Sequence, residues 1–387
     1  MSEGPVDIPT SIADIRSAVR DLCHRYPAEY WRSLEPDTYP GEFVDELTRQ
    51  GWLAGLIPQR YGGGGLSLAE ASAVLEEINA EGGNAAACHA QMYMVTVLVR
   101  HGREEQKQEL LPRIAGGELR LQAFAVTEPD AGSDTTSIST TATRTATGYV
   151  IRGQKVFTSR AAHSDLMLLL ARTSPRQAEA RHKGLSLFLV DLRRAQGQIR
   201  IRPIRTMMNH STTEVFFDDL ELPADALVGE EGEGFFHVLA GMNAERILIA
   251  SECLGDGRWF VRRASQHARE RVVFGRPIGA NQGVQFPIAA AHANLEAADL
   301  MRWRAASLFD QGERCGAEAN MAKYLASEAS WQAANACLDA HGGWGFTADF
   351  DIERKFRETR LYKVAPVSNN LVLAYLGHSV LGLPRSY

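Results

Sequence analysis

The sequence predicts an α+β protein in which a β domain lies between two helical domains. Apolar residues recur at helical spacing over residues 11–118, and short runs rich in Val, Thr, Phe and Ile follow between residues 121 and 223. The helical period returns in long segments after the Gly-rich stretch 229–236. We therefore expect three domains, with these bounds: helical 1–120, β 121–228 and helical bundle 229–387.

The first region contains several helices. "IADIRSAVRDL" and "FVDELTRQGWL" carry apolar residues at helical spacing, and Ser67 with Glu70 makes a capping-box start for a further helix. "YGGGG" (61–65) precedes that helix. No strand leads into these glycines and no Lys follows them, so we interpret them as a flexible turn rather than a phosphate-binding loop.

The second and third regions differ in their periodicity. Strand-like segments in the second region are "LQAFAVTEP", "TRTATGYVIRGQKVFTS", "LMLLLAR", "LSLFLVDL", "IRIRPIRTM" and "TEVFFDDLEL". Long helical segments in the third are "NAERILIASECLGDGRWFVRRASQHARER" and "AEANMAKYLASEASWQAANACLDAHGG". Near the end, "LYKVAPVSNN" (361–370) interrupts the helical pattern, because Pro and Asn favour loops.

Composition excludes several classes of function. The net charge is -6 with both signs interspersed, which argues against nucleic acid as a partner. The cysteines are odd in number, far apart and never arranged as CxxC, so they predict neither a disulfide framework nor a zinc site. We find no signal-peptide pattern and no apolar run near the roughly 20 residues that cross a bilayer. The expectation is a cytoplasmic protein without a membrane partner.

The segment "FAVTEPDAGSD" (124–134) leaves an apolar strand and at once becomes a turn. Such a strand exit places backbone N–H groups and hydroxyls at one edge of a sheet. Gly132 allows a ligand to approach the main chain, and Thr127 and Ser133 can hydrogen-bond ring heteroatoms or phosphates. From the residues alone, an ordinary hairpin turn and a ligand-binding turn are equally consistent with this pattern.

Two long patterns in this chain resemble the signatures of the acyl-CoA dehydrogenase family. The first signature is filled by Ala125, Val126, Thr127, Glu128, Ala131, Gly132, Ser133, Asp134 and Ser137. The second, in "DAHGGWGFTADFDIERKFRE", is filled by Asp339, Gly342, Gly343, Gly345, Phe346, Asp349, Arg354 and Glu358. The resemblance spans nearly the whole chain, and it implies the family's fold, with a β-barrel-like middle domain and a C-terminal helical bundle.

The resemblance also implies an FAD cofactor and a shared binding site. The implied flavin contacts are Phe124, Val126, Thr127, Ser133, Phe157, Thr158, Ser159, Ser368 and Asn370. Residues implied to reach the FAD of a neighbouring subunit are Arg271, Val273, Asn281, Gln282, Asp339 and Gly343. The family therefore implies a homo-oligomer, usually a tetramer. FAD would fit these residue types, since its pyrophosphate favours N–H groups and an Arg while its ring favours an aromatic face.

Members of the family oxidise acyl-CoA thioesters to 2-enoyl-CoA and pass the electrons to an electron-transfer flavoprotein. The reaction needs a carboxylate base, which in many members lies at the position that aligns with Pro366 here. Others, similar to isovaleryl-CoA and long-chain acyl-CoA dehydrogenases, carry a Glu before an Arg on a long helix. "NAER" (243–246) matches that site. The resemblance thus implies Glu245 as base, with Asn243 and Arg246 near the substrate.

Pro366 has a second consequence, because the aligned residue in the family donates a backbone N–H to the thioester carbonyl. Proline has no N–H, and losing one such donor costs about 3 kcal/mol in the transition state. The N–H of Val367 is the candidate replacement, and Ser133 completes the expected substrate contacts. Glu128 and Asp134 are expected to fix the signature turn and to have no catalytic role.

The leading hypothesis is an FAD-dependent acyl-CoA dehydrogenase of fatty acid metabolism, with a weak preference for a branched or a medium-to-long acyl chain. An acyl-carrier protein could present the substrate in place of CoA. One alternative keeps the fold and changes the chemistry to that of an oxidase, a hydroxylase or a desulfinase-like enzyme. Another is a non-catalytic scaffold that retains FAD as structure.

Overall fold

The computed structural model describes residues 11–195 and 197–385, and it divides into two compact units. One unit, which we call the sheet unit, comprises residues 37–66 and 86–242. The other, the bundle unit, comprises the described residues 11–36, 67–85 and 243–385. The N-terminal helical region is thus divided between them.

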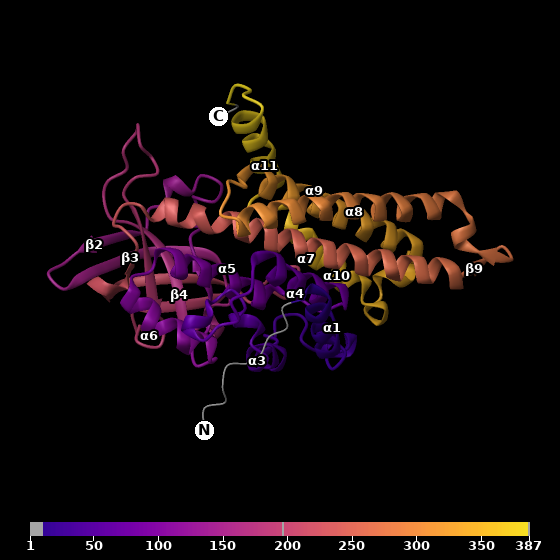
Figure 1. Cartoon of the computed structure of the whole chain (residues 1–387), viewed down its shortest axis with the longest axis horizontal. Coiled ribbons are helices and arrows are strands. Elements are labelled where there is room, and N and C mark those ends of the chain that lie inside the picture. Colours follow the sequence, from indigo (N-terminus) through magenta and orange to yellow (C-terminus); the bar gives the residue numbers. More distant parts are fainter. Residues whose placement is uncertain (1–10, 196, 386–387) are drawn as a thin grey trace. The chain divides into compact units, whose positions relative to one another are not determined.

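The sheet unit is built on a mixed sheet (Figure 1). Its strands are β1 (Leu121–Ala125), β2 (Thr141–Arg144), β3 (Gly148–Ser159), β4 (Leu166–Arg172), β5 (Leu185–Asp191), β6 (Ile199–Pro203), β7 (Thr212–Pro223) and β8 (Leu227–Val228). They follow the order β6-β7-β3-β2-β4-β5-β8, and β1 pairs with β4 in parallel. The predicted strand "LMLLLAR" is β4, whose first six residues are all buried.

The helices of the sheet unit are α3 (Gly41–Arg49), α5 (Ala86–His101) and α6 (Glu104–Ala115). Helix α5 packs against β1, and the rings of Tyr93 and Phe124 lie 6.0 Å apart there. The core of the sheet follows the period of two, because Met167, Leu169 and Ala171 of β4 point into one apolar cluster. This packing fixes β1, and with it the start of the signature turn.

The bundle unit is almost entirely helical. Its helices are α1 (Ile12–Cys23), α2 (Ala28–Ser33), α4 (Leu68–Ala80), α7 (Gly234–Glu270, from Asn243 onward), α8 (Gln282–Asp310), α9 (Gly316–His341), α10 (Ile352–Arg360) and α11 (Asn369–Tyr375). Figure 1 shows α7, α8 and α9 running side by side. The predicted capping box opens α4, where Ser67 and Glu70 bond reciprocally.

Buried charge holds α4 in this bundle. Glu76 of α4 is fully buried, and it pairs with Arg16 of α1, Arg258 of α7 and Arg302 of α8. The bond from Arg16 is 2.7 Å and that from Arg302 is 3.2 Å. Disrupting such a buried charge cluster is costly, and the cluster therefore favours one arrangement of these helices.

The segment "LYKVAPVSNN" contains the loop that precedes α11 and the first two residues of that helix. It begins with a 3-10 turn (Leu361–Lys363), and the Ala365–Pro366 peptide bond is cis. Ser368 is the N-cap of α11, and its side chain accepts from the N–H of Leu371 at 3.3 Å. The predicted break in the helical pattern is confirmed, and Ser368 caps the helix that follows it.

Candidate functional site

The signature turn is fixed by Glu128, which is 5 % exposed. Its carboxylate accepts from the N–H of Ser139 at 2.6 Å, the N–H of Thr140 at 2.9 Å and Nζ of Lys155 at 2.9 Å. These donors outweigh burial and lower the pKa of Glu128 to about 2. Glu128 therefore remains charged, and its hydrogen bonds hold the turn, which confirms its predicted structural role.

Asp134 closes the other end of the turn. It accepts from the hydroxyl of Thr136 at 2.5 Å and also from that of Ser137. The hydroxyl of Ser137 and then that of Thr136 lower the pKa of Asp134. Carboxylates therefore hold both ends of the turn, as expected.

The structure brings two predicted flavin-contact segments together within the sheet unit. The N–H of Val156 donates to the carbonyl of Thr127 at 2.9 Å. Nζ of the fully buried Lys155 donates to the carbonyl of Val126 at 2.8 Å. The signature turn and the segment 157–159 are therefore neighbours, although about 30 residues separate them in the sequence.

Phe157 lies at an irregularity of β3 that the sequence did not predict. Its φ is 56°, and the pairing of β3 with β7 shifts register between Lys155 and Thr158. A positive φ is costly for a bulky residue, and bulges of this kind often redirect a side chain near a functional site. Phe157 is 63 % exposed as a result, with its aromatic face available.

The hydroxyl groups beside Phe157 fit a polar ring edge. Thr158 is fully buried, and within residues 11–195 and 197–385 its Oγ1 has no hydrogen-bond partner. Ser159 is half-buried, as is Thr127, whereas Ser133 is exposed. An aromatic face next to hydroxyls and main-chain groups is the donor set that an isoalloxazine ring requires. These residues fit a flavin.

A second cluster lies in the bundle unit, on α7. Glu245 is 7 % exposed and has the guanidinium of Arg246 as its charged neighbour. Arg246 donates from Nη1 to Oδ1 of Asn243 at 3.2 Å. Burial lowers the pKa of Arg246, while the charge of Glu245 acts in the opposite direction. The three residues predicted from "NAER" therefore form one local group on a single helical turn.

The loop before α11 is held by a lysine that sequence reasoning missed. Nζ of Lys323, on α9, donates to the carbonyl of Val367 at 2.6 Å and to Oδ1 of Asn369 at 2.7 Å. The only signal in the sequence is a Lys within the buried Ala stripe of α9, at Ala319, Ala322 and Ala326. Asn370 and Pro366 are exposed, and Val367 and Ser368 are half-buried.

The residues expected to reach a neighbouring subunit lie on the surface of the bundle unit. Arg271, Gln282, Asp339 and Gly343 are exposed, and Val273 and Asn281 are half-buried. Strands β9 (Val272–Val273) and β10 (Arg276–Pro277) form a hairpin around Phe274 and Gly275, both with positive φ. The turn leaves Phe274 fully exposed at the hairpin tip.

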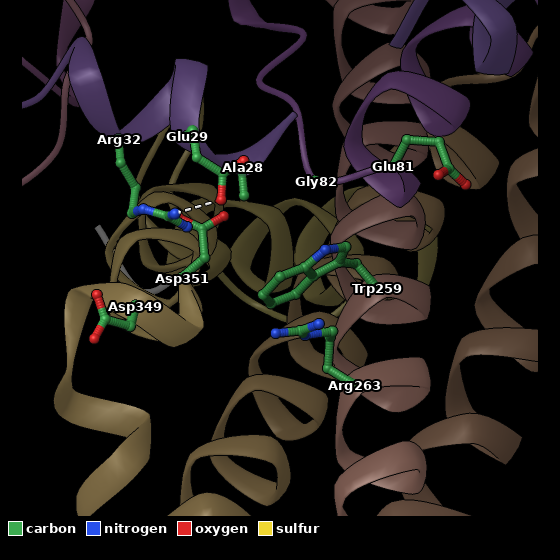
Figure 2. Close-up of a pocket in the computed structure, with 9 residues that line it drawn as sticks. All are labelled: Ala28, Glu29, Arg32, Glu81, Gly82, Trp259, Arg263, Asp349 and Asp351. Atoms are coloured by element: carbon green, nitrogen blue, oxygen red, sulfur yellow. Dashed lines mark hydrogen bonds and ion pairs between the residues drawn. The ribbon is translucent and has the colours of Figure 1, made fainter. Parts of the chain in front are cut away.

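A polar pocket of about 220 Å³ lies elsewhere in the bundle unit (Figure 2). Arg263 lies 5.6 Å from the ring of Trp259, and Arg32 donates to Glu29 at 2.8 Å. Charged residues such as Glu81 and Asp349 complete the lining. Small-molecule sites are usually larger and mostly apolar, so this pocket does not suit an acyl-CoA or a flavin.

Among residues 11–195 and 197–385, no group of three His, Cys, Asp or Glu side chains is arranged to hold a metal ion. No helix within those ranges has both the length and the apolarity to span a membrane. All five cysteines are buried free thiols.

Comparisons with known proteins identify one family over most of the chain. Family models described as the N-terminal, middle and C-terminal domains of acyl-CoA dehydrogenase match residues 11–118, 123–220 and 232–371. The acyl-CoA dehydrogenase FadE12 of Mycobacterium tuberculosis is 37% identical over 383 residues, covering 96% of each chain. The short/branched chain specific acyl-CoA dehydrogenase of Rattus norvegicus is 31% identical, covering 85% of this chain and 76% of its own.

A solved structure of similar shape is the glutaryl-coenzyme A dehydrogenase in complex with glutaryl-CoA. It has a TM-score of 0.89 and 26% sequence identity, and the match covers 98% of this chain and 97% of that one. Three consecutive domain models and relatives above 30% identity across most of the sequence agree with the two signatures and with the observed fold. This chain belongs to the acyl-CoA dehydrogenase family, a family of flavin-dependent oxidoreductases.

Proposed function

We propose that this protein oxidises an acyl-CoA thioester to the 2-enoyl-CoA, with Glu245 as the base that removes the α proton. The observation that carries the proposal is the buried Glu245 beside Arg246 on α7, in a chain whose alternative base position is Pro366. A carboxylate removed from water is a stronger base than one in solution. Arg246 places a positive charge beside the position that we assign to the base.

FAD is the cofactor we infer from the fit of the residues near Phe157. Bound FAD supplies a hydride acceptor for the β carbon. The residues that would hold it are Phe124, Val126, Thr127, Ser133, Phe157, Thr158, Ser159, Ser368 and Asn370. Phe157 would stack on the ring, and the hydroxyl of the half-buried Ser159 would hydrogen-bond its polar edge.

The thioester carbonyl needs a donor, and Pro366 has no N–H to offer. We infer that the N–H of Val367 donates in its place, with Ser133, Asn243 and Arg246 as further substrate contacts. The position of this donor affects the rate, because a well-placed N–H stabilises the developing charge by about 3 kcal/mol. The half-buried position of Val367 in an anchored loop supports this assignment.

We also infer that the protein acts as a homo-oligomer, in the form of a tetramer. The bundle unit exposes large apolar side chains at Phe274, Phe286, Leu300, Trp344 and Phe346. Arg271, Val273, Asn281, Gln282, Asp339 and Gly343 would contact the FAD of another subunit. Electrons would leave to an electron-transfer flavoprotein in the cytoplasm. A branched or a medium-to-long acyl chain is the proposed substrate, and the name of the rat relative is consistent with a branch.

An anaerobic titration of the FAD-loaded protein with a panel of acyl-CoAs tests this proposal. We expect bleaching of the oxidised flavin absorbance and formation of the 2-enoyl-CoA, with a preference among chain lengths. Acyl groups on a carrier protein form a second arm of the panel. Rapid reoxidation by oxygen with peroxide release would identify an oxidase, and no bleaching by any substrate would overturn the proposal.

A further inference from the structure

Lys323 is a buried lysine that bonds both to the loop before α11 and to Asn369, the first residue of that helix. The residue is 0 % exposed, and it lies in the middle of α9 (Gly316–His341). Nζ donates to the carbonyl of Val367 at 2.6 Å and to Oδ1 of Asn369 at 2.7 Å. Burying an ammonium group is costly unless its hydrogen bonds are satisfied, so these contacts determine the position of the side chain.

The same hydrogen bonds restrict the loop. The first holds the carbonyl of Val367 toward Nζ and so restrains the backbone of the residue that carries the proposed donor N–H. The second continues into α9, since Nδ2 of Asn369 donates to Glu328 at 2.7 Å and to Ser327 at 3.0 Å. Glu328 also accepts from Nζ of Lys363 at 2.8 Å, so both ends of the loop are tied to α9.

Lys323 is also within electrostatic range of the Glu245 group. The charge of Arg246 acts on it from α7, together with Cys253 from the same helix. Glu328 on α9 and Lys363 before the loop are the other charged groups that face it. Burial lowers the pKa of Lys323 to about 8, followed in size by the opposing effect of Cys253. The positive charges of Arg246 and Lys323 therefore repel each other, which places Lys323 in the electrostatic environment of the α7 group.

We infer that Lys323 is a positioning residue for the oxidation, acting through the loop and not on the substrate itself. By bonding to the carbonyl of Val367 and to Asn369, it holds the residue to which we assign the carbonyl donor and the neighbours of the two assigned flavin contacts. The inference rests on the proposed function. A neutral side chain at position 323 would lose these hydrogen bonds, so the loop would be held less firmly. Small displacements of a catalytic group slow a reaction considerably.

The test compares Lys323→Met with Lys355→Met in the FAD-loaded protein. Lys355 is the control for the loss of a buried lysine, because it is also 0 % exposed in the bundle unit but bonds to Asp256, Glu358 and the carbonyl of Gly83. Its removal takes a counter-charge from two buried carboxylates, so only the folded, FAD-loaded fraction of each variant is compared. The measurements are the rate of flavin reduction per bound FAD at saturating substrate, the substrate Kd and the pH profile. We expect Lys323→Met to retain FAD and to slow reduction by about 10- to 100-fold.

Three further results decide the inference. The wild-type rate should fall as the pH rises through about 8, whereas Lys323→Met should lack that alkaline limb. Lys323→Arg should restore part of the rate, and Asn369→Ala should reproduce part of the loss if Lys323→Met does not fold. An equal loss in Lys355→Met, or a wild-type rate and profile in Lys323→Met, would overturn the inference. Wild-type protein that no acyl-CoA reduces would instead overturn the proposed function, on which the inference rests.

Discussion

At the scale of single residues, the pair of Glu128 and Lys155 connects the signature turn to β3. Both side chains are almost fully buried, and Lys155 has its carboxylate partner at 2.9 Å. Such a pair contributes little net stability compared with apolar residues, yet breaking it leaves one buried charge uncompensated. The pair therefore specifies the geometry of the turn more than it stabilises the whole chain.

Lys155→Met should lower the free energy of unfolding by about 3–5 kcal/mol, because Glu128 would lose its counter-charge. Urea denaturation of the FAD-free protein measures this loss. The double variant Lys155→Met with Glu128→Gln is the control, and it should recover most of the stability. A single variant as stable as the double variant would show that the charge of Glu128 does not depend on Lys155.

The pH dependence of stability gives a second prediction for Glu128. The pKa of Glu128 in the folded protein is about 2, below the ordinary value of 4.5. Its contribution to the free energy of unfolding is therefore fully present above pH 4.5. The contribution is lost as the pH falls from 4.5 toward 2, because the unfolded carboxyl protonates first. The difference in unfolding midpoint between wild type and Glu128→Gln should therefore shrink as the pH falls from about 6 to about 3. A constant difference would contradict the assigned pKa.

Residue-level prediction from sequence succeeded where local spacing carries the information. Glu128 and Asp134 were expected to fix their turn, and their hydrogen bonds confirm this. The left-handed backbone of Phe157 and the bonds of Lys323 were not predicted. Both depend on long-range packing, and neither a Phe in a strand nor a Lys in an Ala-rich helix indicates the partner that it will meet.

At the scale of elements, the bulge in β3 is the feature that presents Phe157. A residue with a φ of 56° would lose its strain if it were glycine, although glycine gains freedom in the unfolded chain. Phe157→Gly should therefore change stability by only about 1 kcal/mol. It should weaken FAD binding by about 2- to 10-fold, since one aromatic contact is lost.

Equilibrium titration of the FAD-free protein with FAD measures this effect. Phe157→Tyr is the matched control, because it keeps the ring at the same backbone conformation and should bind FAD as the wild type does. Full FAD affinity in Phe157→Gly would show that the ring does not contact the flavin.

Most elements could be predicted from periodicity, including the capping box at Ser67 and the strand "LMLLLAR". The short strands β9 and β10 could not, because two residues each carry no alternation. The expected domain bounds at 120/121 and 228/229 remain predictions. The compact units divide differently, with helix α7 contributing its first residues to the sheet unit and the rest to the bundle unit.

At the scale of the whole molecule, the exposed apolar residues of the bundle unit favour self-association. Leu300 is 75 % exposed, Phe346 73 % and Phe274 fully so. Monomeric proteins rarely leave several large apolar side chains uncovered on one unit. Light scattering coupled to gel filtration should give the mass of a tetramer for the wild type.

Leu300→Glu should shift the mass toward a dimer or a monomer, because it would place a charge in an apolar contact. Gln177→Glu, at an exposed position in the sheet unit, adds the same charge and should leave the mass unchanged. A monomeric wild type would contradict the proposed sharing of FAD between subunits.

The central claim is that Glu245 removes the α proton. Stopped-flow reduction of the bound flavin, with Glu245→Gln compared to wild type and to Glu252→Gln, tests it most directly. Glu252 is on the same helix and is 1 % exposed, so it controls for the loss of a buried carboxylate. We predict that Glu245→Gln binds FAD and acyl-CoA but reduces about 10²- to 10⁴-fold more slowly, while Glu252→Gln stays near the wild-type rate. Near-normal reduction in Glu245→Gln would contradict the account.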